Sequence, residues 1–334
     1  MVATSGRWYL FLMLTSRPTL RSIYLFTLVL CGILAASSGT AAESSFRAEP
    51  ISEGVWLMRP TGEVALRTNS VVMEREDGLL VIESQPTPQA ARELIAAIGK
   101  LSSKPIRFLV LSHAHTESTG GASAFPESTL VIASPQTQET LKDESRDLAV
   151  ELRRYASLPA DWEEPTRRLA TLLSPSILKL DDPQLPVQIV PASRGHCHGL
   201  LLVQWNEGKS YYAGPLVFPD GNPYADTEST NLTGWITTMN SLALSRPEVI
   251  LPLRGAAFDS DALRQQRDAI AWIRAEVSFA MVERVPVDEI VEAVLASDKL
   301  SRYFDPDQLP FIARTLIEVA VHEADKSQKD KSKF

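Results

Sequence analysis

The chain has 334 residues, with 41 acidic against 33 basic side chains, five histidines and two cysteines. A composition of 44% hydrophobic and 22% charged residues is typical of a folded globular protein and excludes wholesale disorder. The formal charge of −8 provides no basic surface for nucleic acid, and two cysteines cannot build a disulfide-rich scaffold or a four-cysteine zinc site.

Residues 1–42 have the organisation of a secretory signal peptide. Basic residues precede an apolar run at residues 23–34, small residues follow, and cleavage is expected after Ala42. The apolar run is too short for the ~20 residues of a bilayer-spanning helix, so we expect no stable membrane span after cleavage. An uncleaved anchor is the alternative, because residues 8–14 are also apolar, and translation starting at Met13 would shorten the leader. We predict a secreted or periplasmic protein.

Beyond Ala42 the hydrophobic pattern alternates between strands and helices. The expected strands are short apolar runs bounded by turn residues, at 55–59, 70–74, 79–83, 106–111, 129–133, 187–190, 200–205, 210–213 and 249–252. The expected helices start at Pro88 with Thr87 as N-cap, cover 136–155 and 232–244, and account for the chain after Asp261. Residues 158–176 are rich in proline and suit an irregular insertion or lid. This order favours an α/β fold.

Four of the five histidines fall in two short loops. His113 and His115 directly follow the apolar strand at 106–111, and His196 and His198 lie in a glycine-flanked loop that precedes another strand. Two histidines one residue apart on such a loop can turn both rings toward one point, which suits a tetrahedral metal. A single pair can equally cap backbone groups, but two glycine-flanked pairs beside strands favour a metal site.

These loops resemble the motifs of the metallo-β-lactamase-fold superfamily. Residues 112–121 are similar to its Thr-His-x-His-x-Asp-His-x-Gly-Gly signature, and residues 195–199 to its Gly-His-x-x-Gly loop. Matching segments lie at Thr68-Asn69-Ser70, Val81-Ile82-Glu83, Tyr212-Ala213-Gly214-Pro215 and Ile250-Leu251-Pro252-Leu253-Arg254-Gly255, so the resemblance covers roughly residues 50–256. It implies a four-layer αβ/βα sandwich with a metal site at one edge of the two sheets.

The resemblance also implies a domain organisation and a metal. We expect a signal peptide at 1–42, a metallo-β-lactamase-like domain at 43–258, a helical extension packed on it at 259–324, and a disordered tail at 325–334. Zinc would be held by His113, His115 and His196. The exported leader and helical C-terminus are also similar, more weakly, to periplasmic zinc metallohydrolases associated with quinoprotein dehydrogenases.

The family's second metal position is not retained. Its four ligand positions are Glu117, Ser118, Pro215 and Arg254 in this sequence, and only Glu117 can bind a cation. A single carboxylate will not hold a second zinc, and Arg254 places a fixed positive charge where that ion would lie. The resemblance therefore implies one zinc ion at most in a degenerate member of the family.

Two functions follow from this site. In the first, one zinc activates water, Glu117 orients the water or accepts its proton, and Arg254 stabilises a developing oxyanion, so that an ester, thioester or amide of a small-molecule substrate is hydrolysed. In the second, the protein is catalytically inactive and serves as a metal- or ligand-binding accessory protein, which the loss of the bridging Asp at Pro215 favours. An iron oxygenase would need a carboxylate at this position. The substrate and the oligomeric state do not follow from the sequence.

Several neighbouring residues offer alternative ligands. Cys197 and His198 follow His196 and can add to the metal site or point away from it. Asp220 and Asp226 lie in a loop rich in proline, glycine and asparagine, where they can supply a carboxylate or form turns. Glu83 replaces the family's Asp, and we expect it to accept hydrogen bonds from the metal loop or from a ligand histidine.

Overall fold

The computed structural model describes residues 45–62, 67–153, 162–219, 225, 227–300 and 309–331. The chain divides into two units, Met1–Glu43 and Ser44–Phe334, and the described residues all belong to the second. The predicted signal peptide and the two candidate carboxylates Asp220 and Asp226 lie outside the described residues. Within them, no helix combines the length and the apolarity that crossing a membrane requires.

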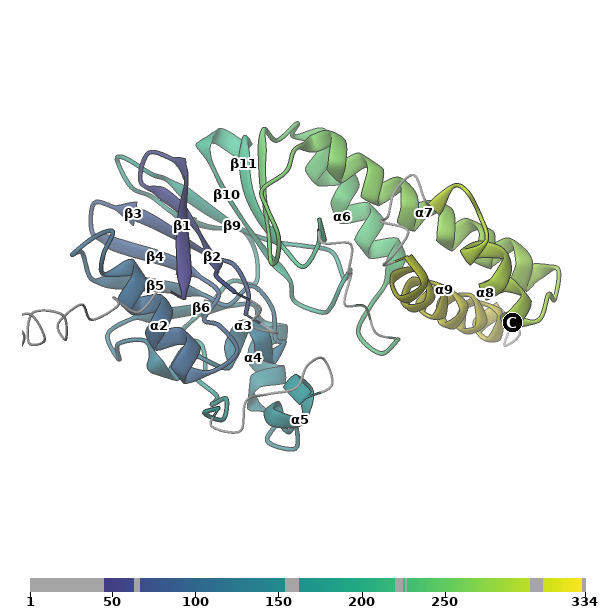
Figure 1. Cartoon of the computed structure of the whole chain (residues 1–334), viewed down its shortest axis with the longest axis horizontal. Coiled ribbons are helices and arrows are strands. Elements are labelled where there is room, and N and C mark those ends of the chain that lie inside the picture. The colour runs from purple at the N-terminus through teal and green to yellow at the C-terminus, as the bar shows by residue number, and fades with distance from the viewer. Residues whose placement is uncertain are drawn as a thin grey trace, which may run out of the picture. The chain divides into compact units, whose positions relative to one another are not determined.

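One sheet has seven strands in their chain order (Figure 1). They are β1 (Phe46–Ser52), β2 (Val55–Pro60), β3 (Ser70–Arg75), β4 (Gly78–Ile82), β5 (Ile106–Val110), β6 (Leu130–Ala133) and β7 (Leu172–Leu173). Strands β1 to β4 pair antiparallel, and β4 to β7 pair parallel. Every residue of β4 is buried, as expected for a strand that is covered on both faces.

The second sheet has five strands in the order β12-β11-β10-β9-β8. They are β8 (Leu178–Leu180), β9 (Val187–Pro191), β10 (Leu201–Trp205), β11 (Ser210–Gly214) and β12 (Val249–Pro252). Only β11 and β12 pair parallel, and the other neighbours are antiparallel.

The helices surround the two sheets (Figure 1). They are α2 (Pro88–Ile98), α3 (Thr116–Thr119), α4 (Pro135–Lys142), α5 (Leu148–Arg153), α6 (Leu232–Leu244), α7 (Ser260–Val282), α8 (Val287–Leu295) and α9 (Leu309–Lys331). Helix α2 lies beside the first sheet, and α6 to α9 lie on the side of the second (Figure 1). One apolar cluster joins α2 to the first sheet, a second fills the space between the sheets, and a third joins the second sheet to α6–α9. The predicted four-layer sandwich with C-terminal helices is therefore confirmed.

Local signals place several of these elements. Thr87 caps α2 as predicted, because its hydroxyl oxygen accepts a hydrogen bond from the Ala90 amide at 3.2 Å. The expected helix over 136–155 is instead two helices, because Asp143 leaves the helical conformation (φ −70°, ψ 97°) and its carboxylate accepts hydrogen bonds from the Ser145 amide and hydroxyl.

The C-terminal tail also differs from the expectation. Helix α9 continues to Lys331, through residues 325–331 that the sequence assigned to a disordered tail. This stretch consists mainly of lysine, glutamine and aspartate without glycine or proline, so nothing in it ends a helix that is already packed on the core.

The candidate metal loops lie at one edge of the sandwich. The segments that follow β4, β5, β6, β11 and β12 leave the sheets at their carboxyl ends, and the loop between β9 and β10 joins them there: the Leu201 amide donates to the Ser112 carbonyl at 2.8 Å. Ligand sites in α/β folds form at such edges.

Candidate metal centre

The loop after β5 presents two histidines in succession. His113 follows the buried strand and is fully buried, and His115 has an extended backbone (φ −68°, ψ 146°) at the N-cap of the short helix α3. The helix then places Glu117 two residues after His115 and four residues after His113. Three candidate groups thus come from five consecutive residues.

The two glycines of this loop permit its close contact with the segment after β4. A Cβ atom on Gly121 would lie 2.3 Å from the Ser84 carbonyl oxygen and 2.7 Å from that of Thr87. No larger residue fits there. The Gly121 amide donates to the Gln85 carbonyl at 2.8 Å, which joins the histidine loop to the carboxyl end of β4.

The third histidine comes from the second sheet. His196 lies in the loop between β9 and β10 and is fully buried. Its ring packs edge-on against the ring of Trp235 on α6, with the centroids 5.5 Å apart and an interplanar angle of 81°. The Thr230 hydroxyl donates to the His196 carbonyl at 3.0 Å. The ring is thus held by the start of α6.

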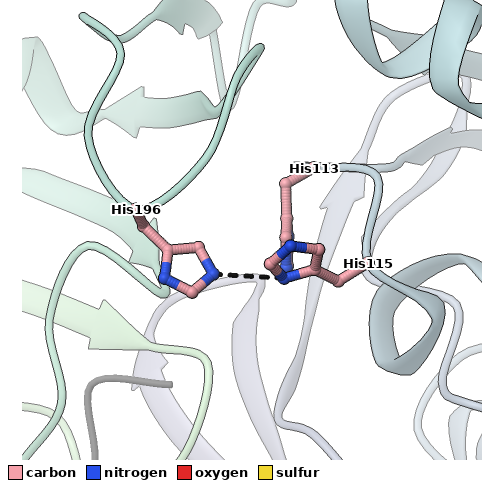
Figure 2. Close-up of side chains that lie close together, drawn as sticks. All are labelled: His113, His115 and His196. Carbon is pink, nitrogen blue, oxygen red and sulfur yellow. Dashed lines mark hydrogen bonds between the residues drawn. The ribbon is translucent and has the colours of Figure 1, made fainter. Parts of the chain in front are cut away.

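The three imidazoles face one another (Figure 2). Their ring centroids are 4.9, 5.6 and 4.9 Å apart, and each pair of rings is nearly perpendicular. The Nε2 atom of His196 lies 3.2 Å from Nδ1 of His115, and one nitrogen from each ring lies within 4.8 Å of the other two. Ligand bonds of about 2.0–2.1 Å to a tetrahedral zinc separate the donor atoms by about 3.4 Å. One pair is close to that spacing, and all three donor atoms lie within 4.8 Å of one another.

Glu117 faces the same point. Its Oε1 atom lies 3.5 Å from Nε2 of His113 and 3.7 Å from Nδ1 of His115. Burial works against the charge of this carboxylate, but its interactions with His113 and His115 outweigh burial and hold the pKa of Glu117 well below its usual range. Glu117 is therefore ionised near neutral pH.

His113 is oriented by a chain of hydroxyl groups. Its Nδ1 atom lies 3.0 Å from the Ser112 hydroxyl, which leaves Nε2 facing Glu117. Ser112 also interacts with the buried Glu83, whose Oε1 atom accepts a 2.8 Å hydrogen bond from the Tyr212 hydroxyl. Burial lowers the pKa of His113, so the ring is neutral, as a metal ligand must be.

The residues at the family's second-metal positions do not supply its ligands. Ser118 and Pro215 are both buried there and neither can replace the missing ligands. Arg254 donates a 2.8 Å hydrogen bond to the Arg67 carbonyl. Burial is the main cause of the lowered pKa of His113, and the charges of His115 and Arg254 lower it further. A second cation beside the charge of Arg254 would be repelled.

A cavity of about 490 Å³ adjoins the site. His115 and Glu117 line it, and so do Arg146 and Glu151. Arg146 donates to both Glu151 oxygens, at 2.8 and 2.7 Å, and the Thr116 hydroxyl donates to Glu151 at 2.6 Å. The volume suits a small ligand.

Two candidate ligands lie in this cavity rather than in the histidine cluster. Cys197 and His198 both line it, and the group of side chains that could hold a metal among the described residues consists of the three histidines. Arg254 does not line it.

Comparison with known proteins now identifies the fold family. The family model of the metallo-beta-lactamase superfamily matches residues 64–254. The chain belongs to this superfamily. The match covers both candidate metal loops and the Arg254 position, which agrees with the extent of the resemblance in the sequence.

One curated relative is an alkylsulfatase. The linear primary-alkylsulfatase of Pseudomonas sp. (strain ATCC 19151) is 22% identical in an alignment of length 278 that covers 70% of this chain and 51% of that protein. The chain thus spans about half the length of the curated relative that it matches.

Solved structures show the same fold at low identity. The metallo-beta-lactamase from Pontibacter korlensis superposes with a TM-score of 0.55 and 16% identity, over 67% of this chain and 97% of that one. The stereoselective inverting sec-alkylsulfatase Pisa1 from Pseudomonas sp. superposes with a TM-score of 0.65 and 14% identity, over 83% of this chain and 50% of that one. These similarities extend the shared fold beyond the family-model match and establish no activity.

Several site residues were not predicted to act there. Tyr212 carries a hydroxyl group in a fully buried strand, which could have indicated a hydrogen-bond partner such as Glu83. Trp235 and Thr230 carry no such signal, because only the fold brings α6 against His196. Glu83 was expected to accept hydrogen bonds from the metal loop or from a ligand histidine. In the structure its Oε1 atom accepts from the Tyr212 hydroxyl, and Ser112 and Ser118 add hydrogen bonds from that loop.

Proposed function

We propose that this chain is an exported hydrolase in which His113, His115 and His196 hold one zinc ion and Glu117 serves as general base. The observation that carries the proposal is the meeting of three imidazoles and an ionised carboxylate beside the 490 Å³ cavity, which His115 and Glu117 line. The bond cleaved is an ester, thioester or amide.

The donor set fits zinc. Three imidazoles with an open fourth position are a known catalytic zinc set. His113 Nε2 is buried and makes no hydrogen bond within the described part of the chain, and the 3.5 Å to Glu117 is too long for a strong one. Buried polar atoms normally have partners, so this nitrogen is suited to a ligand bond. Zinc in such a site supplies a Lewis acid and a hydroxide nucleophile near neutral pH.

Side chains of the protein supply the proton transfer, the orientation of the ligand ring and additional positive charge. Glu117 can take a proton from the attacking water and return it to the leaving group, because its carboxylate is ionised and faces the cavity. The Ser112 hydroxyl, 3.0 Å from Nδ1 of His113, fixes the orientation of that ring. We propose that Arg254, which does not line the cavity, stabilises the developing oxyanion through the positive charge that also reaches His113, in place of a second metal.

The cavity favours a small polar substrate. Only Ala114, Leu152 and Cys197 give it apolar lining, and the other lining residues carry hydroxyl, imidazole, guanidinium or carboxylate groups. The methyl and methylene groups of these side chains add apolar surface, so the lining is mixed and also accepts a short alkyl group. The name of the curated relative adds a short sulfate ester to the candidates.

Metal analysis and turnover test the proposal together. The purified full chain should hold about one zinc per molecule, and it should hydrolyse at least one of four chromogenic probes: p-nitrophenyl acetate, p-nitrophenyl sulfate, an acyl thioester and an anilide. His196→Ala should lose both the zinc and the turnover, since two histidines and a water hold zinc far more weakly. His322→Ala is the matched control, because His322 is exposed on α9. A metal-free chain that turns over none of the probes would contradict the proposal.

A second candidate is metal binding without turnover. Pro215 favours it, because the family's bridging carboxylate is lost and no described residue replaces it. Stoichiometric zinc with no hydrolysis of any probe, and with His196→Ala losing only the zinc, would support this candidate over the hydrolase.

We also propose export to the periplasm or outside the cell. The support is the order of basic, apolar and small residues in the first 42 positions. A mature protein whose N-terminal residue is Glu43 is the expected product. An intact N-terminus on cytosolic protein would contradict export.

A further inference from the structure

The C-terminal helix makes a contact near the metal site. Glu323, on α9, accepts a hydrogen bond from the Leu232 amide, the first amide of α6. Its other carboxylate oxygen lies 3.6 Å from Nε of Arg274 on α7. The side chain is largely buried, with 17% of its surface exposed. Glu323 thus joins three helices at the N-terminus of α6.

This contact satisfies a group that a helix leaves open. The first amides of a helix have no partner within it, and a carboxylate is favoured there because the helix dipole is positive at that end. Asn231 satisfies another amide of the same turn, since its side-chain oxygen accepts from Gly234 at 2.7 Å. One cap therefore comes from α6's own loop and the other from a residue about 90 positions away in sequence.

The same turn of α6 holds the loop of the third histidine. The Asn231 amide donates to the Gly195 carbonyl at 2.7 Å, and the Thr230 hydroxyl donates to the His196 carbonyl at 3.0 Å. Gly234 is pressed on this loop so closely that a Cβ atom would lie 1.5 Å from the Arg194 carbonyl oxygen. These contacts therefore anchor the His196 backbone to the start of α6.

The His196 ring depends on the same helix. It packs edge-on against Trp235, which is fully buried, and the Trp235 indole donates to the Leu216 carbonyl at 2.7 Å. Trp235 shares its apolar cluster with Leu316, Ile317 and Ala320 of α9. Both the backbone and the ring of His196 are thus supported by an element that α9 stabilises.

We propose that Glu323 is a positioning residue for His196. The C-terminal helices then contribute to the geometry of the metal site and are more than an appended bundle. This inference rests on the proposed function in one respect, namely that His196 holds a metal. It adds a long-range contact from the C-terminal helix, through the first turn of α6, to that histidine.

Zinc affinity and local amide exchange test the inference in the full chain. Glu323→Ala should weaken zinc binding about tenfold, the lower end of what residues that orient metal ligands contribute. Zinc binding is measured by competition with a fluorescent chelator. Amide hydrogen exchange should become faster in residues 194–198 and 231–236 and stay unchanged in the first sheet. Glu323→Gln keeps an oxygen acceptor and should restore most of both properties.

Glu318→Ala is the matched control. Glu318 is an exposed glutamate on the same helix, so its removal should leave zinc affinity and exchange unchanged. If Glu323→Ala fails to fold, Glu323→Asp takes its place, because it keeps the charge but shortens the reach to the Leu232 amide.

Three outcomes overturn the inference. They are unchanged zinc affinity with unchanged local exchange, faster exchange that is uniform over the whole fold, and no rescue by Glu323→Gln. A wild-type chain that binds no zinc contradicts the proposed function instead, and the exchange measurement then still tests the contact from Glu323 to the His196 loop.

Discussion

Glu83 is the most unusual buried acid of the described residues. It lies at the end of β4 in a left-handed backbone conformation, with φ at 71°, and none of its surface is exposed. Burial raises the pKa of Glu83 to about 7, although hydrogen bonds with Ser112, Ser118 and Tyr212 work in the opposite direction. The carboxyl group thus titrates near neutral pH, and the Ser112 hydroxyl lies between it and His113.

This pKa predicts how stability depends on pH. Glu83 has an ordinary pKa of 4.5 when unfolded and about 7 when folded. Because the folded protein binds the proton of Glu83 more tightly than the unfolded chain does, the protonated group stabilises the fold. This contribution is fully present below pH 4.5 and is lost as the pH rises through 7. Glu83→Gln stays neutral throughout, so between pH 5 and 8 it should gain about 3 kcal/mol of unfolding free energy relative to the wild type.

Urea denaturation of the metal-free protein at pH 5 and at pH 8 measures this difference. Glu53→Gln is the control, because Glu53 is exposed and should show no gain over this range. An equal effect of Glu83→Gln at the two pH values would show that Glu83 is already ionised at pH 5 in the folded protein.

At the level of single residues, the three histidines were predictable from the sequence, whereas the residues that hold them in place were not. His113, His115 and His196 stand in short motifs whose spacing and glycines are visible in the sequence. Glu117 was predictable from the same motif. Tyr212, Thr230 and Trp235 act through contacts across 34 to 129 positions, and such contacts exist only once the two sheets are packed.

Among the secondary-structure elements, those bounded by local signals were predicted best. Helix α6 begins and ends at Leu232 and Leu244, as expected from its apolar spacing, and α2 begins after its Thr87 cap. The helix expected over 136–155 is divided because Asp143 binds Ser145 and Arg146 turns toward Glu151. That second contact depends on Thr116, far away in the sequence, so helix propensity alone could not predict it.

A buried arginine joins the two sheets at the edge opposite the metal site. Arg75, the last residue of β3, donates to the carbonyls of Leu180, Asp181 and Leu185 at 2.9–3.1 Å. Its side chain is 3% exposed and lies 3.9 Å from the carboxylate of Asp182. These contacts fix the turn between β8 and β9 against the first sheet.

Arg75→Met should therefore destabilise the fold without affecting the metal. It leaves buried carbonyl groups and Asp182 without their partner, which should cost about 3 kcal/mol of unfolding free energy in urea denaturation. Zinc affinity should stay within twofold of the wild type. Arg107→Met, on the exposed face of β5, should cost less than about 0.5 kcal/mol. A weakened zinc site in Arg75→Met would mean that the two edges of the sandwich are coupled.

For the molecule as a whole, the candidate metal site joins the two halves of the sandwich. His113 and His115 come from the first sheet and His196 from the second, and the helices after residue 259 support His196 through α6. The fold class and its four layers were predictable from the order of motifs. The dependence of one half on the C-terminal helices was not, because α9 has no motif that points to the site.

Zinc should accordingly stabilise the whole fold and not one half of it. A ligand that binds only the folded state, at a hundredfold excess over its dissociation constant, adds about 2.7 kcal/mol of stability, or about 5 °C in Tm for a chain of this size. Thermal unfolding with and without zinc measures the shift. Magnesium should give none, because it prefers oxygen ligands, and His115→Ala should abolish the zinc shift while His322→Ala retains it. A single unfolding transition should move as a unit, because the ligands come from both sheets. A zinc shift confined to one of two separate transitions would mean that the three rings do not share an ion in solution.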